Sequence, residues 1–155
     1  MSDQSASLVV FRTGPMRFGL DVDLVQRVVA ACEISPLPGA PAAVNGIVTL
    51  GGDIVAVVDP ILAFFPDQAS ELGVASRFLL VRTPLRTLAI IADTVDGIQA
   101  RPMGSAAPLP ASIAQLKEIA AAPDGLIYIS DPEGLLSQSD ELRLSAAIVE
   151  FARAP

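Results

Sequence analysis

The chain has 155 residues, of which 52% are hydrophobic and 17% are charged, and its formal net charge at pH 7 is −7. This length and apolar content suit one domain with a substantial core, while the scattered positions of the nine arginines and one lysine exclude the basic stripe that nucleic-acid binding requires. Histidine is absent, which excludes Ser-His-Asp and Cys-His catalysis and removes a common ligand of metal sites. We therefore expect a non-enzymatic protein without a cofactor or a metal.

The sequence predicts a cytoplasmic protein. Residues 1–7 are polar and lack the basic segment of a secretory signal. No apolar run reaches the roughly 18 residues that span a bilayer, so we expect no direct membrane insertion. Cys32 is the single cysteine and cannot form an intrachain disulfide. Because it follows an apolar run and has no basic neighbour in sequence, we predict a buried, inert thiol.

The first predicted element is a β-hairpin. The segment LVVFRTGPMRFGLDVD begins at Leu8 and joins two apolar runs through a Gly-Pro turn. Residues 21–32 then place four apolar side chains on one helical face: Leu24, Val25, Val28 and Val29. We predict a short helix there that runs into a strand. Three prolines and a glycine within 33–41 predict an irregular, stiff loop.

The segment GIVTLGGDIVAVVDP, from Gly46 to Pro60, has the pattern of a strand, a tight turn and a second strand. The glycine pair at 51 and 52 supplies the turn. Asp59 and Pro60 predict the cap and first position of a short helical turn. The polar residues 65–76 then connect the two halves of the chain.

The second half repeats this order at an offset of about 70 residues. FLLVRTPLRTLAIIAD, from Phe78, is again a hairpin, and PDGLIYISDPEGLL, from Pro123, again ends in Asp-Pro. Asp131 and Pro132 therefore predict a second capped turn. Between these segments, 101–112 is a proline-rich loop, and 113–122 is either a helical turn or a strand. We infer two similar small β subdomains within one folded unit.

A C-terminal helix is predicted over 139–154. Ser139 can cap it, and acidic residues occupy the first turn, where the helix dipole favours them. Apolar residues follow at helical spacing in one stripe (Leu142, Ala146 and Val149) and beside it (Leu144, Ile148 and Phe151). The helix either packs on the body of the protein or presents a surface to a partner.

No segment carries a catalytic or phosphate-binding pattern. The aspartates at strand ends are typical caps and turn-formers. A metal or acid–base role is the alternative, but their spacing resembles neither a calcium loop nor a paired-carboxylate site. The segment TLGGD lacks the lysine of a phosphate loop. Proline-rich loops, exposed aliphatic residues and strand edges instead favour a surface that binds other proteins.

Three segments in this order resemble the CheW family of bacterial chemotaxis coupling proteins: LVVFRTGPMRFGLDVDLVQRVV, ISPLPGAPAAVNGIVTLGGDIVAVVDP and RFLLVRT…LAIIADTVDGI. The resemblance covers residues 7–137. It implies an all-β fold with short helices, in which two SH3-like five-stranded β-barrels, roughly 7–65 and 77–137, share a hydrophobic core. The C-terminal helix predicted above then occupies the remaining residues, 138–155. It also implies a non-catalytic adaptor or scaffold of a two-component system, which couples the cytoplasmic tips of chemoreceptors to the regulatory domain of a CheA-type histidine kinase.

The resemblance also implies which residues bind partner proteins: Val25, Gln26, Val28, Gly46, Thr49, Leu50, Gly51 and Gly52. Three of them match the family's V-Q-x-V/I segment near the receptor-binding groove. The others match or replace its Gly-x-x-Asn-Leu-Arg-Gly segment, with Thr49 in place of asparagine and Gly51 in place of arginine. Asp59 matches the aspartate that ends the following strand, while Ala56 and Pro60 replace the family's proline and leucine.

The glycine at 51 is the departure with the largest physical consequence. An interface arginine offers five donors and often contributes about 2 kcal/mol or more, whereas glycine contributes none of this. We interpret Gly52 as the turn glycine and Gly51 as a vacant place, which predicts weaker coupling to standard receptors or a different set of partners. The alternative function is a ligand-sensing CheW-like regulatory domain that binds a small apolar or anionic molecule in the groove between the barrels.

Overall fold

A computed structural model describes residues 7–102, 104–105 and 116–153. The first half of the chain forms β1 (Ser7–Thr13), β2 (Met16–Asp21), the 3₁₀ turn η1 (Val22–Leu24), β3 (Val25–Ala30), β4 (Val44–Leu50), β5 (Asp53–Val58) and the 3₁₀ turn η2 (Pro60–Ala63). The second half forms β6 (Arg77–Arg82), β7 (Thr87–Ala92), β8 (Thr94–Ala100), β9 (Gly104–Ser105), β10 (Leu116–Ala122), β11 (Gly125–Ser130), the 3₁₀ turn η3 (Pro132–Gly134) and the helix α1 (Gln138–Arg153).

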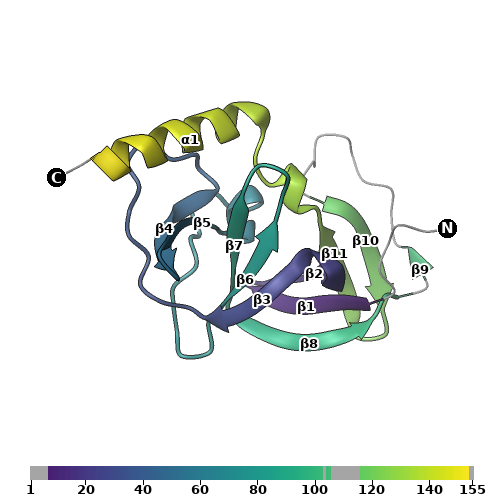
Figure 1. Cartoon of the computed structure of the whole chain (residues 1–155). Coiled ribbons are helices and arrows are strands. Elements are labelled where there is room, and N and C mark those ends of the chain that lie inside the picture. The colour runs from purple at the N-terminus through teal and green to yellow at the C-terminus, as the bar shows by residue number, and fades with distance from the viewer. Residues whose placement is uncertain (1–6, 103, 106–115, 154–155) are drawn as a thin grey trace.

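The strands form two curved sheets, and α1 lies across one end of the molecule (Figure 1). One sheet has six strands in the order β8-β1-β2-β11-β10-β9, and the other has five in the order β3-β6-β7-β5-β4. The predicted fold class is confirmed: the protein is mostly β, its two sheets are SH3-like, and a helix follows. The two-residue β9 adds a sixth strand to one sheet. In the described part of the chain the edge strands of a sheet do not pair with each other, so neither barrel is closed.

The internal repeat is visible in the topology. The hairpin β1–β2 corresponds to β6–β7, β3 to β8, and β4–β5 to β10–β11, and corresponding strands take the same places in the two sheet orders. Each sheet, however, combines strands from both halves of the chain. The six-stranded sheet takes its central hairpin β1–β2 from the first half and its other strands from the second half, and the five-stranded sheet does the reverse. The predicted subdomains, 7–65 and 77–137, therefore do not coincide with the sheets. The reason is that the chain runs on through η1 after β2, and through Asp93 after β7, into an edge strand of the opposite sheet.

One apolar cluster lies between the two sheets, and each sheet also contains a smaller cluster of its own. Along β1, Val9 and Phe11 face a central core shared by both sheets, while Leu8 and Val10 face a smaller cluster inside the six-stranded sheet. The side chains of β6 likewise alternate between two clusters: one side faces the central core, and the other faces a cluster inside the five-stranded sheet. Because both faces of these strands are buried, their sequences are continuous apolar runs rather than alternating ones.

The links between the sheets are hydrogen bonded. The hydroxyl of Thr13 donates to the carbonyl of Ile91 at 2.8 Å, and the amide of Gly14 donates to the Asp93 carboxylate at 2.8 Å.

The predicted caps are confirmed: Asp59 accepts from Ile61 N at the start of η2, and Asp131 accepts from Glu133 N at the start of η3.

Two local predictions were refined. In 21–32 the helical part is a single 3₁₀ turn, and the strand begins at Val25, because β3 pairs with β6 from that residue on. In 113–122 the strand alternative holds from Leu116 to Ala122, and residues 113–115 lie outside the described residues. The predicted loop 101–112 also lies largely outside them.

The helix α1 begins at Gln138, one residue before the segment 139–154 that the apolar spacing predicts, and is capped by Ser137, not by Ser139. Asp140 N donates to Ser137 Oγ at 3.1 Å, and Ser137 N donates to the Asp140 carboxylate at 3.3 Å, which is a reciprocal capping box. The helix packs on the body, but through Leu144 and Ala147, with Ile148 partly buried. The exposed face carries the predicted stripe, with Leu142 70% and Val149 49% exposed.

Two further observations concern the surface. Cys32 is exposed, so the prediction of a buried thiol was wrong. It lies just beyond the end of β3, where the chain has left the sheet that would have covered it. Among the described residues, no helix is both long and apolar enough to cross a membrane.

Candidate functional site: a groove on the five-stranded sheet

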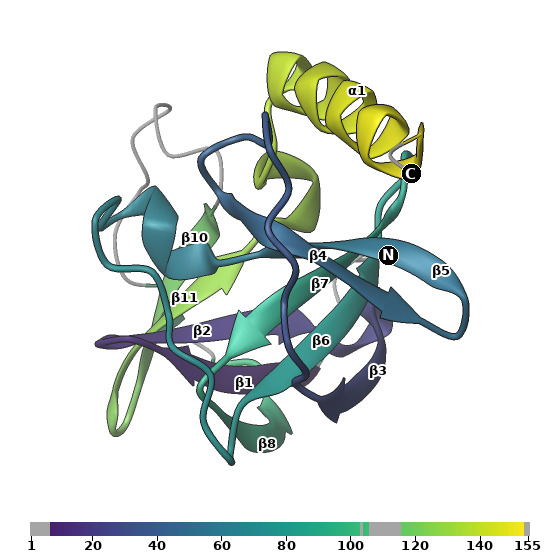
Figure 2. The same ribbon diagram turned by 90° about the vertical axis from the view of Figure 1, so that its left-hand side faces the viewer.

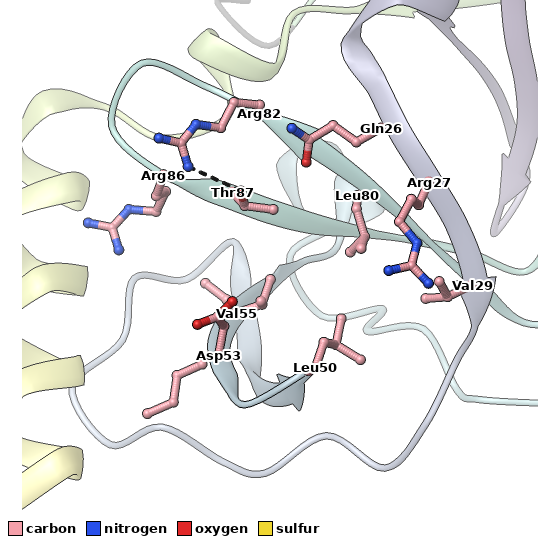
Figure 3. Close-up of a pocket in the computed structure, with 13 residues that line it drawn as sticks. Gln26, Arg27, Val29, Leu50, Asp53, Val55, Leu80, Arg82, Arg86 and Thr87 are labelled. Atoms are coloured by element: carbon pink, nitrogen blue, oxygen red, sulfur yellow. Dashed lines mark hydrogen bonds between the residues drawn. The ribbon is translucent and has the colours of Figure 1, made fainter.

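A groove of about 690 Å³ opens on the five-stranded sheet, between β3 on one side and the β4–β5 hairpin on the other (Figure 3). Three predicted protein-binding residues line it, namely Gln26, Leu50 and Gly51. Its apolar lining includes Val29, Val55 and Leu80, which belong to or pack on the cluster inside this sheet. Figure 2 shows the β4–β5 hairpin projecting beside β6 and β7, beneath α1. The space between the two sheets, by contrast, is filled by the central core.

The rim of the groove at the β4–β5 turn is set by its two glycines. Leu50 pairs with Asp53, so the turn has two central residues, and these have φ of +58° at Gly51 and +89° at Gly52. Positive φ at both central positions is what a type I′ hairpin turn requires. The backbone therefore favours glycine at both positions, and Gly51 is a turn glycine as well as a departure from the family pattern. A Cβ on either glycine would meet nothing within 4 Å.

Gly46 has a different role from the turn glycines. It is buried in β4 at a bulge between Val44 and Gly46, and it does not line the groove. A Cβ there would lie 2.2 Å from the carbonyl oxygen of Ser35. Glycine at this position allows the loop before β4 to pair with Ile47 through Ser35.

A second bulge decides which side chains of β3 enter the groove. The register of β3 against β6 shifts between Val25 and Arg27, and Gln26 and Arg27 both line the groove as a result. Val25 is half-buried against the central core. Val28 is 45% exposed on β3, outside the groove lining.

The remaining predicted residues lie on the exposed side of the hairpin. Thr49 is exposed on β4, which is an edge strand, and Gly52 is exposed at the turn. The structure therefore brings three of the eight predicted residues together in the groove and places the other five around it or beneath it. Whether any of them contacts a partner stays a prediction.

Sequence reasoning missed the charged lining of the groove. Arg27, Arg82 and Arg86 line it together with one acidic residue, Asp53. Arg86 is paired with Glu141 on α1 at 2.8 Å, while Arg82 donates to the hydroxyl of Thr87 at 3.3 Å (Figure 3). The groove is thus positive in a chain whose formal net charge is −7. The repeated Arg-Thr dipeptides at 12–13 and 82–83 were the sequence signal for one of these arginines.

The groove offers charge and apolar surface. In the described part of the chain, no group of three or more His, Cys, Asp or Glu side chains is placed to hold a metal ion. The lining residues combine guanidinium donors with aliphatic side chains. This combination suits the binding of a peptide segment or of an anionic molecule.

Comparison with known proteins gives one family. The CheW-like domain matches residues 7–140. Among curated proteins, the chain is 29% identical over 100 residues to Protein FrzA of Myxococcus xanthus, covering 64% of this chain and 62% of that protein. It is 26% identical over 98 residues to Chemotaxis protein CheW of Rhizobium meliloti, covering 63% of each. These matches span less than two thirds of either relative.

The fold comparison agrees with the family match. The scaffolding protein TtCheW of Thermoanaerobacter tengcongensis has a crystal structure that superposes with a TM-score of 0.75 at 24% identity, covering 90% of this chain and 92% of that one. This likeness shows that the two proteins share a fold. The family match covers far more than half of the 155 residues and includes both sheets. The chain therefore belongs to the CheW-like domain family.

Proposed function

We propose that this protein is a non-catalytic signalling adaptor, which couples the cytoplasmic tip of a chemoreceptor to the regulatory domain of a CheA-type histidine kinase. The observation that carries the proposal is the CheW-like match over residues 7–140. Proteins named Chemotaxis protein CheW are among the relatives, and a scaffolding protein shares the fold. CheW family members are non-catalytic scaffolds, and the work assigned to this chain is to hold two proteins in a fixed geometry in the cytoplasm.

The groove on the five-stranded sheet is the surface that we assign to the receptor tip. Gln26 comes from the segment that resembles the family's receptor-binding strand, and Leu50 and Gly51 come from the segment that resembles its Asn-Leu-Arg-Gly turn. We assign the kinase to surfaces outside the groove, where the resemblance implies that two domains of the same fold pair through their barrels. Because Gly51 supplies no side-chain donor, the receptor affinity depends on other groups in the groove.

A titration with the cognate kinase's regulatory domain tests the proposal. The purified full chain is titrated by isothermal calorimetry, with circular dichroism to show that it is folded. The proposal predicts saturable binding with a Kd below about 100 μM, which corresponds to a binding free energy of roughly −5.5 kcal/mol or better. A folded chain that shows no binding at about 100 μM would overturn the assignment.

A second candidate function is a ligand-sensing domain. The size of the groove favours it, because about 690 Å³ lies within the range of roughly 300–1,000 Å³ that small-molecule sites occupy. The positive lining would select anionic molecules. A thermal-shift screen of small carboxylates and phosphates decides this candidate, since a bound ligand raises the melting temperature. A screen without any ligand-dependent stabilisation would count against ligand sensing and would leave the adaptor function in place.

A further inference from the structure

The groove has a counterpart at the equivalent end of the six-stranded sheet, and we call these two places the mouths of the sheets. In the hairpin β1–β2, Arg12 pairs with Arg17, and in β6–β7 the equivalent pair is Arg82 with Thr87. The edge strands β8 and β3 both carry a register shift beside these hairpins. The two mouths therefore occupy equivalent places in the repeat.

The mouth of the six-stranded sheet is filled by the side chain of Arg17, which is only 11% exposed. Its guanidinium donates to Asp124, in the β10–β11 turn, at 2.7 Å and to Gln99 on β8 at 3.4 Å. Asp96 lies 3.8 Å from Arg17 and 3.3 Å from Arg12. The hydrogen bond from Arg17 holds the pKa of Asp124 below its usual range. The side chain of Arg17 thus spans this mouth, and the carboxylates of Asp96 and Asp124 compensate its positive charge.

The five-stranded sheet lacks all three of these groups. Its β4–β5 turn and the β10–β11 turn each have two central residues, which fixes their correspondence. The replacements are Thr87 for Arg17, Gln26 for Asp96 and Gly52 for Asp124. A short hydroxyl side chain, a neutral amide and a glycine remain where the other mouth has a long cation and two anions. Two of these replacements, Gln26 and Thr87, line the groove.

The mouth of the five-stranded sheet keeps guanidinium groups but not the two carboxylates of the other mouth. Arg82 stands at the position of Arg12, and Arg27 adds a guanidinium that points toward Leu50 across the groove (Figure 3). Neither Arg27 nor Arg82 has an acidic partner among the described residues. Guanidinium groups bind carboxylates through paired, charge-assisted hydrogen bonds. Carboxylates of a partner would therefore supply the ion pairs that Arg27 and Arg82 do not make among the described residues, although Asp53 also lines the groove.

We propose that the groove binds an acidic segment of the receptor tip, whose carboxylates take the places that Asp96 and Asp124 hold in the other sheet. An apolar side chain between them packs on Val55 and Leu80, which belong to the cluster inside the five-stranded sheet. The inference rests on the proposed adaptor function and gives the chemistry of the segment that it recognises: two acidic residues that flank an apolar one. Arg27 and Arg82 replace the interface arginine that the family places at position 51.

The test compares two partners and two salt concentrations. Calorimetry measures the affinity of the full chain for a receptor tip fragment from the same genome and, separately, for the kinase regulatory domain, in about 50 and about 300 mM NaCl. The double variant Arg27→Gln, Arg82→Gln removes both cations from exposed positions, and Arg143→Gln, exposed on α1, is the matched control. We expect the double variant to bind the receptor fragment about tenfold or more weakly, to lose most of the salt dependence, and to bind the kinase domain as the control does.

A second double variant fills the groove with the same side chains that fill the other mouth. Gln26→Asp with Thr87→Arg copies the pair that fills the other mouth, without a change in net charge. We expect it to retain its melting temperature and to lose receptor affinity by about tenfold or more. If the wild type binds the receptor fragment and both double variants bind as the control does, the acidic-segment inference is wrong and the adaptor function stands. If the wild type binds neither partner, the adaptor function itself is overturned.

Discussion

Gly46→Ala is expected to destabilise the fold, because a methyl group there collides with the loop that packs on β4. The new Cβ would lie 2.2 Å from the Ser35 carbonyl oxygen and 2.8 Å from Ile34 Cγ2. The same oxygen accepts a hydrogen bond from Ile47 N at 2.9 Å, and Ser35 N donates to the Ile47 carbonyl at 2.8 Å. Relief of the collision requires the loop to move and both hydrogen bonds to break.

The expected loss follows from these two contributions. Two backbone hydrogen bonds contribute about 1–3 kcal/mol together, and an overpacked methyl group typically costs another 1–3 kcal/mol. We therefore expect the free energy of unfolding to fall by roughly 2–6 kcal/mol. Gly51→Ala is the control, since its Cβ meets nothing within 4 Å. Its left-handed backbone costs about 1–2 kcal/mol, of which the lower entropy of the unfolded chain recovers roughly 0.4–1 kcal/mol.

Urea unfolding followed by far-UV circular dichroism measures both variants. The midpoint for Gly46→Ala should lie clearly below the midpoint for Gly51→Ala, at an unchanged dependence on urea. If Gly46→Ala loses no more stability than Gly51→Ala, the close approach of Ser35 is not what requires glycine at position 46.

Three further predictions can be checked with single variants. Leu144→Ala should cost about 2–5 kcal/mol in urea unfolding, because Leu144 is 0% exposed, whereas Leu142→Ala on the outer face of α1 should stay within about 0.5 kcal/mol; the reverse order would mean that the helix packs through its other stripe. Arg17→Gln should raise the pKa of Asp124, measured by ¹³C NMR of the carboxyl group, since the hydrogen bond from Arg17 holds that pKa low. Because the pKa is lower in the folded state than in the unfolded state, the stabilising effect is complete above about pH 4 and is lost as the pH falls through the folded value, so an unchanged pKa or an unchanged acid dependence of stability would contradict the role of Arg17. Gly51→Arg should tighten receptor binding in calorimetry if the glycine is a simple loss, and unchanged or weaker binding would show that the partner surface has changed with it.

Local structure was largely predictable from the sequence. Apolar runs that end in Arg-Thr identify both central hairpins, and the Asp-Pro pairs identify the capped turns at Asp59 and Asp131. The assignment of hairpins to sheets was not predictable in the same way. Each hairpin pairs with strands of the other half of the chain, and a repeat detected by self-similarity carries no information about which copy a strand joins.

The buried face of α1 shows a second limit. Leu142 and Leu144 begin two apolar stripes of similar strength on this helix, and only contacts from elsewhere decide between them. Arg86, at the β6–β7 turn, pairs with Glu141 at 2.8 Å and donates to Ser145 Oγ at 2.6 Å. These contacts fix the rotation of the helix and bury Leu144.

The candidate site was predicted only in part, for reasons of geometry. Gln26, Leu50 and Gly51 were identified from the resemblance, and all three line the groove. Arg27 was missed because simple alternation along β3 would place it opposite Gln26, and the bulge brings both to one side. Thr87 was missed because its role follows from its short side chain, which stands where the long side chain of Arg17 fills the other sheet. Only a comparison of the two sheets shows this difference.

The central claim is that one copy of this chain holds a receptor and a kinase at the same time. Analytical ultracentrifugation of the full chain with a receptor tip fragment and a kinase regulatory domain tests this most directly. The adaptor account predicts a ternary complex that contains all three proteins and that the Arg27→Gln, Arg82→Gln variant fails to form. If the two partners displace each other, or if only binary complexes form at saturating concentrations, the account is contradicted.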